Sequence, residues 1–475
     1  MTEEHVLICV AWPYANGPLH LGHVAGCYLP PDIQARFERA LGNRVLMVSG
    51  SDEHGTPITV SAEQNNITPQ EVVDTYHSLN SKALLDLGCS WEPQVDARGI
   101  EYGGALFNRT TDERHKELVQ ENFLSLHEAG LFETKTMKQY YEQNADGTGR
   151  FLPDRYVEGT CPACDADGAR GDQCDACGAT YEAEELQNPV SKMNPGAQIE
   201  IRDTDHLFYR LDLFQEALEQ HASTQQTNWK SNVRAMTKQW LDMGLRPRAV
   251  TRDLSWGIPL PLDGEEWEGK CVYVWFEAVQ GYSTCARIWA DSIANEAGHP
   301  HGKDAWKKWW NISEDGTTPR HLYFLGKDNI PFHTVIWPSL IMGLNHAKNG
   351  KTAEDKVQLP GPGDLALETN VPAMEYLMLA GGQFSKSRKH AVWLPSFLER
   401  FDPDTLRYYL GINMPENHDT DFNWPDFVEK INTELIGAYG NFVHRVLTLG
   451  HRLPSEETGP LAGVENMDLT QTGTN

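Results

Sequence analysis

The chain has 475 residues, 40% of them hydrophobic, which is enough for several folded domains and unlike a disordered acidic protein. Its 67 acidic and 40 basic side chains give a formal net charge of -27, which opposes non-specific binding to nucleic acid. The sequence has neither the roughly 18 consecutive apolar residues of a membrane span nor a signal-peptide pattern. We therefore expect a cytoplasmic protein.

The N-terminal part is predicted to form a strand, a helix and a second strand. Residues 6–11 (VLICVA) are a short apolar run, as expected for a parallel strand buried on both faces. An amphipathic stretch at about 23–41 precedes a second apolar run at 44–49. Since such a strand, helix and strand form a right-handed parallel unit, residues 1–117 are predicted as the first half of an α/β domain.

The composition changes between residues 118 and 246, where charged helices flank a glycine- and cysteine-rich stretch. Apolar runs return at 272–276 and 322–325 and predict further strands of the same sheet. The parallel sheet is thus expected to be split by an inserted domain at 118–246 and completed by residues 247–370. Its polar end at 349–370 is predicted to be a surface loop.

Two Cys-x-x-Cys pairs lie inside the inserted region, formed by Cys161, Cys164, Cys174 and Cys177. Each pair presents two thiolates, so that together they complete the tetrahedron that zinc prefers. A disulfide or redox pair is the alternative, which a reducing cytoplasm disfavours. Because four thiolates close the coordination sphere, we predict one structural zinc that does no chemistry.

Two histidines stand where the first strand is predicted to give way to a helix. Asn16 and Gly17 turn the chain, and His20 and His23 then flank Gly22. Both imidazoles should lie at the carboxyl end of a parallel strand, beside free amides that favour phosphate. Taken alone, this segment is equally compatible with two ordinary surface histidines.

A glycine-led basic loop is predicted far downstream, at residues 381–389. It carries Lys386 between Ser385 and Ser387, and a loop of this kind can close on a polyphosphate. By itself it is weak evidence, and the combination with the two histidines is what indicates a nucleotide site.

An amphipathic helix is predicted after residue 422, ending near Gly450. Its apolar residues recur at spacings of three and four, namely Phe427, Ile431, Leu435, Ala438, Phe442 and Val446. Residues 453–475 are predicted to be disordered.

HLGH at 20–23 and FSKS at 384–387 resemble the paired signatures of the class I aminoacyl-tRNA synthetases. Six further motifs, in order, resemble the methionyl-tRNA synthetase family: AWPYANG at 11–17, GSDEHGTP at 50–57, FLPDR at 151–155, RDLSWG at 252–257, YVWFEA at 273–278 and GKDNIPFH at 326–333. The resemblance implies a Rossmann-like catalytic domain split by a zinc-knuckle domain, a signature-loop and stem-contact region at 371–421, and the start of a helical anticodon-binding domain at 422–475.

The resemblance implies an enzyme that forms methionyl-adenylate from methionine and ATP, with Mg²⁺ carried by ATP, and then acylates tRNA(Met). The residues implied for ATP are Asn16, Gly17, His20, Gly22, His23, Ser385, Lys386 and Ser387. Those implied for the charge on the departing pyrophosphate are His20, His23, Lys386 and Arg252. Those implied for methionine are Ala11, Trp12, Tyr14, Asp52, Trp275, Ala278, Tyr282, Asn329 and His333. Asn441 and Arg445 are implied for the anticodon.

Three departures from the family pattern are informative. Gln383 replaces the first lysine of the signature loop, and the second zinc knuckle of some members has no cysteines here. The helical bundle of the family is represented by about one helix, so a longer protein or a separate chain is expected to supply the rest. The alternative function is a non-catalytic zinc-knuckle subunit that binds tRNA or assists assembly.

The acidic surplus is typical of a solubility device or of a halophilic, archaeal member of the family. In the halophilic case, salt screens the repulsion between carboxylates, so the melting temperature should rise with KCl into the molar range. Thermal unfolding at increasing KCl measures this, and a melting temperature that does not change with salt would contradict the halophilic interpretation.

Overall fold

The computed structural model describes residues 4–91, 94–95, 101–102, 106–143, 149–153, 156–170, 174, 177, 184–194, 196–293, 304–384 and 390–452. The tail predicted to be disordered lies outside these residues. No helix within them combines the length and apolar character that crossing a membrane requires.

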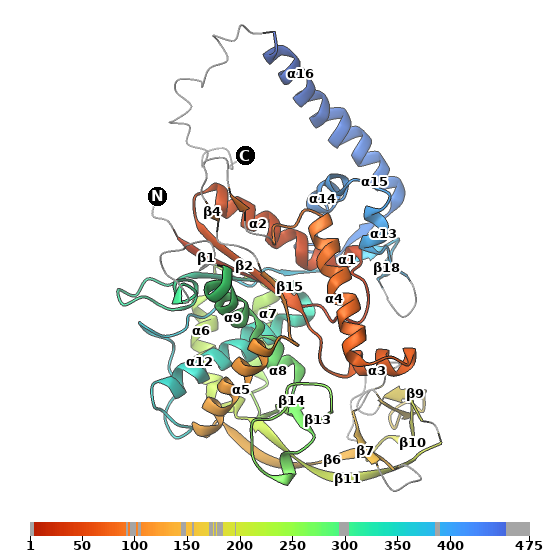
Figure 1. Cartoon of the computed structure of the whole chain (residues 1–475), viewed down its shortest axis with the longest axis vertical. Coiled ribbons are helices and arrows are strands. Elements are labelled where there is room, and N and C mark those ends of the chain that lie inside the picture. The colour runs from red at the N-terminus through yellow and green to blue at the C-terminus, as the bar shows by residue number, and fades with distance from the viewer. Residues whose placement is uncertain are drawn as a thin grey trace.

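A five-stranded parallel sheet forms the centre of the molecule, with strand order β16-β15-β1-β2-β5 (Figure 1). The strands are β1 (His5–Val10), β2 (Arg44–Ser51), β5 (Leu106–Arg109), β15 (Arg320–Gly326) and β16 (Ala373–Met374). Val6 pairs with Val45 on one side and with Arg320 on the other. The predicted parallel sheet and its strands at 6–11, 44–49 and 322–325 are confirmed.

The strand predicted at 272–276 is wrong. The apolar run is divided between β14 (Lys270–Val272), which pairs antiparallel with β13 (Thr251–Asp253), and α8 (Val274–Ala278). An apolar run this short does not distinguish a strand from a buried helical turn.

Side chains of the central strands alternate between two hydrophobic cores. Leu7, Cys9 and Tyr323 face one core, whereas Ile8 and Phe324 face the other. Because both faces are covered, the strands are apolar throughout.

Helices cover both faces of the sheet. Those of the N-terminal half are α1 (Leu21–His23), the π-helix η1 (Val24–Tyr28), α2 (Leu29–Ala40), α3 (Thr56–Asn65), α4 (Pro69–Asp86) and α5 (Glu113–Glu128). Those that follow the inserted strands are α6 (Gln215–Thr224), α7 (Ser231–Asp242), α9 (Gly281–Ile288), η5 (Trp289–Ile293), α11 (Lys307–Trp310), the turns η7 (Lys327–Asn329) and η8 (Phe332–Ile336), and α12 (Trp337–Lys348).

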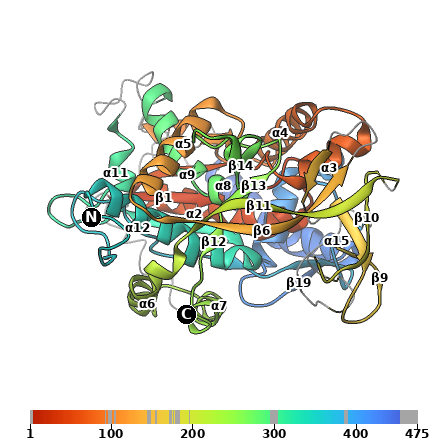
Figure 2. The same ribbon diagram turned by 90° about the horizontal axis from the view of Figure 1, so that it is seen from below.

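The inserted region is built on two long antiparallel strands, β6 (Phe132–Gln143) and β11 (Gln198–Tyr209), which Figure 2 shows crossing the lower face of the molecule. At their far end lies a small sheet of β10 (Gln187–Ser191), β8 (Val157–Thr160) and β9 (Asp167–Arg170) with a core of its own. Helices α5, α6 and α7 contribute to the main core instead. The domain boundaries at 118 and 246 remain predictions.

Buried Asp32 of α2 joins the sheet domain to the C-terminal region. Its carboxylate accepts hydrogen bonds from the Ser90 amide at 2.7 Å and from Arg407 of α14 (Pro403–Ile412) at 2.6 Å. Strands β17 (Leu377–Leu379), β18 (Gly382–Gln383) and β19 (Thr420–Phe422) and helix α13 (Leu394–Leu398) complete this region.

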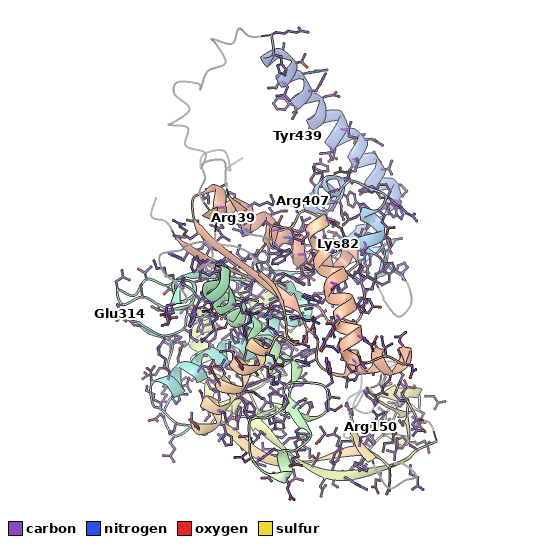
Figure 3. The ribbon with its side chains drawn as sticks, viewed as in Figure 1. Arg39, Lys82, Arg150, Glu314, Arg407 and Tyr439 are labelled. Carbon is purple, nitrogen blue, oxygen red and sulfur yellow. The ribbon has the colours of Figure 1, made fainter. Side chains whose placement is uncertain are left out.

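The last helix runs through α15 (Trp424–Lys430), η9 (Ile431–Gly440) and α16 (Asn441–Gly450) and extends away from the body (Figures 1 and 3). Phe427 and Ile431 are buried, but Tyr439, Phe442 and Val446 are at least half exposed. The predicted helix is confirmed to Gly450, and the second half of its apolar stripe has no partner within the described residues.

Candidate active site

His20 and His23 lie together at the start of the first helix. His20 is the N-cap residue of α1, and the two ring centroids are 3.7 Å apart. The backbone N–H of His20 donates to Nδ1 of His23 at 3.1 Å, so in the neutral His23 ring the remaining hydrogen is on Nε2. The structure therefore brings both imidazoles to one face, as the i, i+3 spacing predicts.

Asn80 of α4 holds the turn that leads into these histidines. Its side-chain oxygen accepts from the Leu19 amide at 3.0 Å, and its side-chain nitrogen donates to the Gly17 carbonyl at 3.2 Å. Asn80 is completely buried. Sequence reasoning missed it because a single asparagine on a helix carries no motif.

A segment from the far end of the chain is paired with the histidine segment. The Leu21 amide donates to the Val392 carbonyl at 3.1 Å, and the Leu394 amide donates to the Leu19 carbonyl at 2.8 Å. The ring of Phe384 stacks on His20 with centroids 4.8 Å apart. The first residues of the glycine-led loop therefore lie against His20, whereas Ser385, Lys386 and Ser387 lie outside the described residues.

A first cavity of about 400 Å³ opens where β1 and β15 end side by side. Its walls include Ala11, Trp12, His20, Gly22, His23, Asp328, Asn329, Tyr376 and Phe384. Adjacent strands whose connections run to opposite sides form a topological switch point, where open α/β sheets bind ligands. The hydroxyl of Tyr376 donates to the Asp328 carboxylate at 2.5 Å, and neither residue was singled out in the sequence.

Tyr282 of α9 and His333 of η8 form a buried hydrogen-bonded pair. His333 Nδ1 lies 3.0 Å from the Asn329 carbonyl, which only accepts, so Nδ1 carries the hydrogen. Its Nε2 therefore accepts from the Tyr282 hydroxyl at 2.8 Å. Burial lowers the pKa of His333 to about 4, which keeps the ring neutral and the pair fixed in this direction at neutral pH.

Trp275 of α8 lies in the wall of a second cavity. Its indole N–H donates to the Tyr14 hydroxyl at 2.6 Å, and its ring meets Phe332 edge to face at 4.4 Å. Trp275 and Tyr14 line the second cavity, of about 420 Å³, together with Arg252. The structure thus places Arg252 on the side of Trp275 and does not bring it to His20 and His23.

The guanidinium of Arg252 is held in place by its own segment. It donates to the Thr251 carbonyl at 2.8 Å and lies 4.1 Å from the centre of the Tyr273 ring.

Asp52 follows β2 and belongs to a buried polar cluster. Its backbone bonds to Pro13 and Ala15 and continues the pairing of β1 with β2. Burial, and then the charge of Glu277, raise the pKa of the Asp52 carboxyl well above its usual value.

Two histidines are hydrogen-bonded to the carboxylate of Glu277. His54 and His115 each lie 2.8 Å from one of its oxygens. Although burial raises the pKa of Glu277, these two partners lower it below its usual value. His54 and Glu277 lie in the motifs GSDEHGTP and YVWFEA but were not assigned a role, and His115 was not predicted. Only the folded chain brings the segment after β2 together with α5 and α8.

Trp12 occupies a cradle made by two glycines. A Cβ atom on Gly281 would lie 2.5 Å from the indole, and one on Gly50 would lie 2.7 Å from it. The ring also meets Tyr282 edge to face at 6.5 Å. Ala278 lies at the end of α8, one turn before Tyr282.

The four cysteines of the inserted region converge. Their sulfur atoms all lie within 4.8 Å of one another, with 3.9 Å between Cys161 and Cys177 and 3.7 Å between Cys164 and Cys174. Four sulfurs bound tetrahedrally to one ion at about 2.3 Å would be roughly 3.8 Å apart. Among the described residues this is the one group of three or more metal-binding side chains within reach of a single ion.

Asn441 and Arg445 are both exposed on α16, far from the two cavities. The Asn441 side chain donates to the Gly437 carbonyl at 2.7 Å.

Comparisons with known proteins agree in pointing to one family. The family model described as tRNA synthetases class I (M) matches residues 6–447. A methionine--tRNA ligase of Roseiflexus sp. (strain RS-1) is 44% identical over 451 residues, which cover 94% of this chain and 69% of the relative. One from Dehalococcoides mccartyi is 47% identical over 447 residues, covering 94% and 72%.

Solved structures have the same fold. The Mycobacterium tuberculosis methionyl-tRNA synthetase bound by methionyl-adenylate matches with a TM-score of 0.65 at 20% identity, covering 95% of this chain and 72% of the other.

Replacement of Gly281 by alanine should lower the free energy of unfolding by about 1–3 kcal/mol, because the new methyl group overlaps the Trp12 indole. Denaturant unfolding measures the change. Gly411→Ala is the matched control, since a Cβ there meets nothing within 4 Å. Adding Trp12→Leu to Gly281→Ala should restore part of the loss, and an equal loss with and without Trp12 would show that the indole is not the constraint.

Proposed function

The chain belongs to the class I tRNA synthetase family, in the branch of the methionine--tRNA ligases, and from this membership we propose that it activates methionine with ATP and transfers the methionyl group to tRNA(Met). The observation that carries the proposal is the first cavity, where the paired histidines and Phe384 meet the ends of β1 and β15.

Methionine is assigned to the space between the two cavities. Asp52 accepts the substrate ammonium, whose positive charge offsets the burial that otherwise raises the carboxyl pKa. The edges of Trp275 and Tyr282 suit a polarisable thioether. The Tyr282–His333 pair leaves no unsatisfied polar group to repel the apolar side chain. Ala11, Trp12, Tyr14, Ala278 and Asn329 complete the proposed lining.

ATP is assigned to the first cavity. The methionine carboxylate attacks the α-phosphorus, the bond to the bridging oxygen breaks, and pyrophosphate leaves with the electron pair. His23 Nε2–H and His20 bind phosphate oxygens on the turn formed by Asn16 and Gly17, and Gly22 lets the nucleotide approach the backbone. Ser385, Lys386 and Ser387 are proposed to meet the leaving group as the signature loop closes. Arg252 is held beside Tyr273 in the second cavity and is not placed to join them. The enzyme therefore aligns reactants and neutralises charge, with no covalent intermediate on the protein.

The adenylate is consumed by tRNA. The 2′-hydroxyl of the terminal ribose attacks the methionyl carbonyl, AMP departs, and the hydroxyl proton is released. Asn441 and Arg445 are proposed to contact anticodon bases through their exposed polar groups. The exposed apolar side chains of the last helix are proposed to pack against the rest of a helical bundle, in the same protein or in a separate chain.

The two proposed metal ions, zinc and Mg²⁺, have different roles. The sulfur–sulfur distances fit one zinc ion, which would hold together the small sheet of β8, β9 and β10 and leave no open coordination position. Mg²⁺ enters with ATP, because the first cavity offers no cluster of three metal-binding side chains within the described residues.

Methionine-dependent exchange between ATP and pyrophosphate tests the activity. Wild-type protein should catalyse exchange with methionine and not with leucine. Asp52→Asn should lower kcat/KM for methionine about 30-fold or more, because the ammonium loses its buried counter-charge. Asp242→Asn, which changes an exposed carboxylate on α7, is the matched control and should not alter it.

Absence of exchange from a protein that still binds tRNA would contradict the proposal and favour the non-catalytic subunit. Under that alternative, Lys386→Ala would leave every measurable function unchanged.

Cys174→Ser should abolish zinc binding and destabilise the small sheet, because three thiolates no longer complete the tetrahedron. Elemental analysis should find one zinc per chain in wild-type protein and in the control Cys89→Ser, whose cysteine lies outside the cluster. Faster hydrogen exchange of residues 157–170 should accompany the loss. Full zinc content in Cys174→Ser would refute the ligand assignment.

A further inference from the structure

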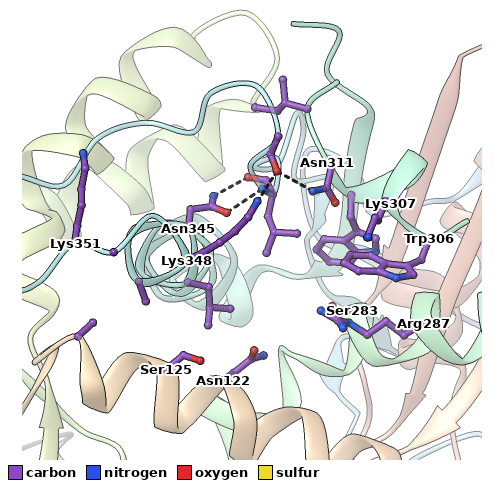
Figure 4. A pocket seen from close by; sticks show the side chains of 18 of the residues that line it. Asn122, Ser125, Ser283, Arg287, Trp306, Lys307, Asn311, Asn345, Lys348 and Lys351 are labelled. Atoms are coloured by element: carbon purple, nitrogen blue, oxygen red, sulfur yellow. Dashed lines mark hydrogen bonds between the residues drawn. The ribbon is translucent and has the colours of Figure 1, made fainter. Parts of the chain in front are cut away.

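A third cavity, of about 990 Å³, lies apart from the two cavities of the proposed active site and has more than twice the volume of either (Figure 4). Helices α5, α9, α11 and α12 and the loop after α12 enclose it. In Figure 4, Asn122 and Ser125 of α5 and Ser283 and Arg287 of α9 lie along the lower side of the space, and Asn345 and Lys348 of α12 lie above them. None of the residues assigned above to methionine, ATP or tRNA lines it.

Arg287 is a half-buried cation that forms no ion pair with another residue that the structure describes. Its guanidinium lies 4.2 Å from the centre of the Trp306 ring. Its Nε atom is buried and has no hydrogen-bond partner in the described structure. Burial lowers its pKa, and Glu121, the carboxylate whose charge acts on it, forms no ion pair with it. In a chain with 67 acidic side chains, a half-buried arginine with no carboxylate partner among the described residues is unusual.

Further groups in the same wall have unused hydrogen-bonding capacity. The Nε1 of Trp310 and the Oδ1 of Asn311 are buried without partners in the part of the chain that the structure describes. Such groups are normally satisfied by protein, water or a ligand. Three tryptophan rings, those of Trp306, Trp310 and Trp337, give the cavity flat apolar surfaces.

The balance of charge around the cavity favours an anion. Arg287, Lys307, Lys348 and Lys351 line it, against two carboxylates, Glu128 and Glu314. Lys307 is paired with Asp304 at 3.0 Å, and Lys348 donates to the Gly363 carbonyl at 2.7 Å. Lys351 donates to the side-chain oxygen of Gln358 at 3.2 Å. Arg287 is therefore the cation left to bind a ligand, and its planar fork of donors matches a carboxylate or phosphate.

Hydrogen bonds hold the mouth of the cavity open without a ligand. The Gly363 carbonyl accepts from Asn311 at 2.9 Å and from Lys348, as the dashed lines of Figure 4 show. Asn345 exchanges two hydrogen bonds with the backbone of Leu365, at 3.0 and 2.9 Å. A ligand would therefore enter a site that is already formed, with little cost of ordering side chains.

We propose that this cavity binds a small flat organic anion, whose carboxylate or phosphate pairs with the Arg287 guanidinium while its ring packs among the tryptophans. The site is additional to the one proposed for methionine and ATP. It shares one wall with that site, because Trp337 lines the cavity and also lies 6.4 Å from the ring of Tyr282.

Isothermal titration of the whole chain with benzoate and, separately, with inorganic phosphate tests this site. Wild-type protein should bind benzoate saturably at millimolar concentrations and should not bind benzamide, its neutral analogue. Arg287→Leu should weaken binding about ten-fold or more. Arg287→Lys should weaken it less, because lysine keeps the positive charge but lacks the planar fork of guanidinium donors. Arg248→Leu is the matched control, because Arg248 also lies over a tryptophan, Trp240, but outside the cavity.

Binding of phosphate but not benzoate, lost in Arg287→Leu, would assign the site to phosphate-bearing ligands. The proposal is overturned if wild-type protein binds neither anion, or if Arg287→Leu binds as wild type does, which would place the anion at another site such as the paired histidines. Methionine-dependent exchange measured in Arg287→Leu separates this outcome from a failure of the proposed activity.

Discussion

The parallel pairing of β1 with β15 is the constraint on which the candidate active site depends. Because β1 lies between β2 and β15, the chain leaves its carboxyl end toward one side while β15 leaves toward the other, and a crevice opens between them. Trp12 and Asn329 reach this crevice because each stands a few residues beyond a strand end, and the turn after β1 brings the paired histidines to it as well.

Around the crevice, most buried polar side chains have a hydrogen-bond partner. Tyr282 donates to His333, Trp275 donates to Tyr14, and Glu277 is shared by two histidines. The indole nitrogen of Trp12 and one oxygen of Asp52 are exceptions, because both are buried without a partner in the described structure. In the proposed reaction the methionine ammonium pairs with that oxygen of Asp52, so the substrate completes part of a network that the protein leaves unfinished.

Local patterns made the sheet and the convergence of the four cysteines predictable from the sequence. Continuous apolar runs identified three of the central strands, and the spacing of two histidines placed their rings together. The run at 272–276 failed because a few apolar residues fit a strand and a buried helical turn equally well. Asn80 carries no motif, and Phe384 and Glu277 lie in motifs that do not reveal their roles, because these roles come from contacts between segments distant in sequence. Arg252 was assigned a role from its family motif, but the motif did not reveal that it lies on the side of Trp275 and away from the paired histidines.

The central position of β1 also has a consequence for synthesis. One neighbour, β2, is made at once, but β15 begins more than 300 residues later, which at about 5–20 residues per second is a delay of roughly 15–60 s. During that time one edge of an apolar strand stays unpaired as the chain leaves the ribosome. The inserted region with its four cysteines has time to fold first, and the nascent chain is exposed to aggregation and to chaperones until residue 326 emerges.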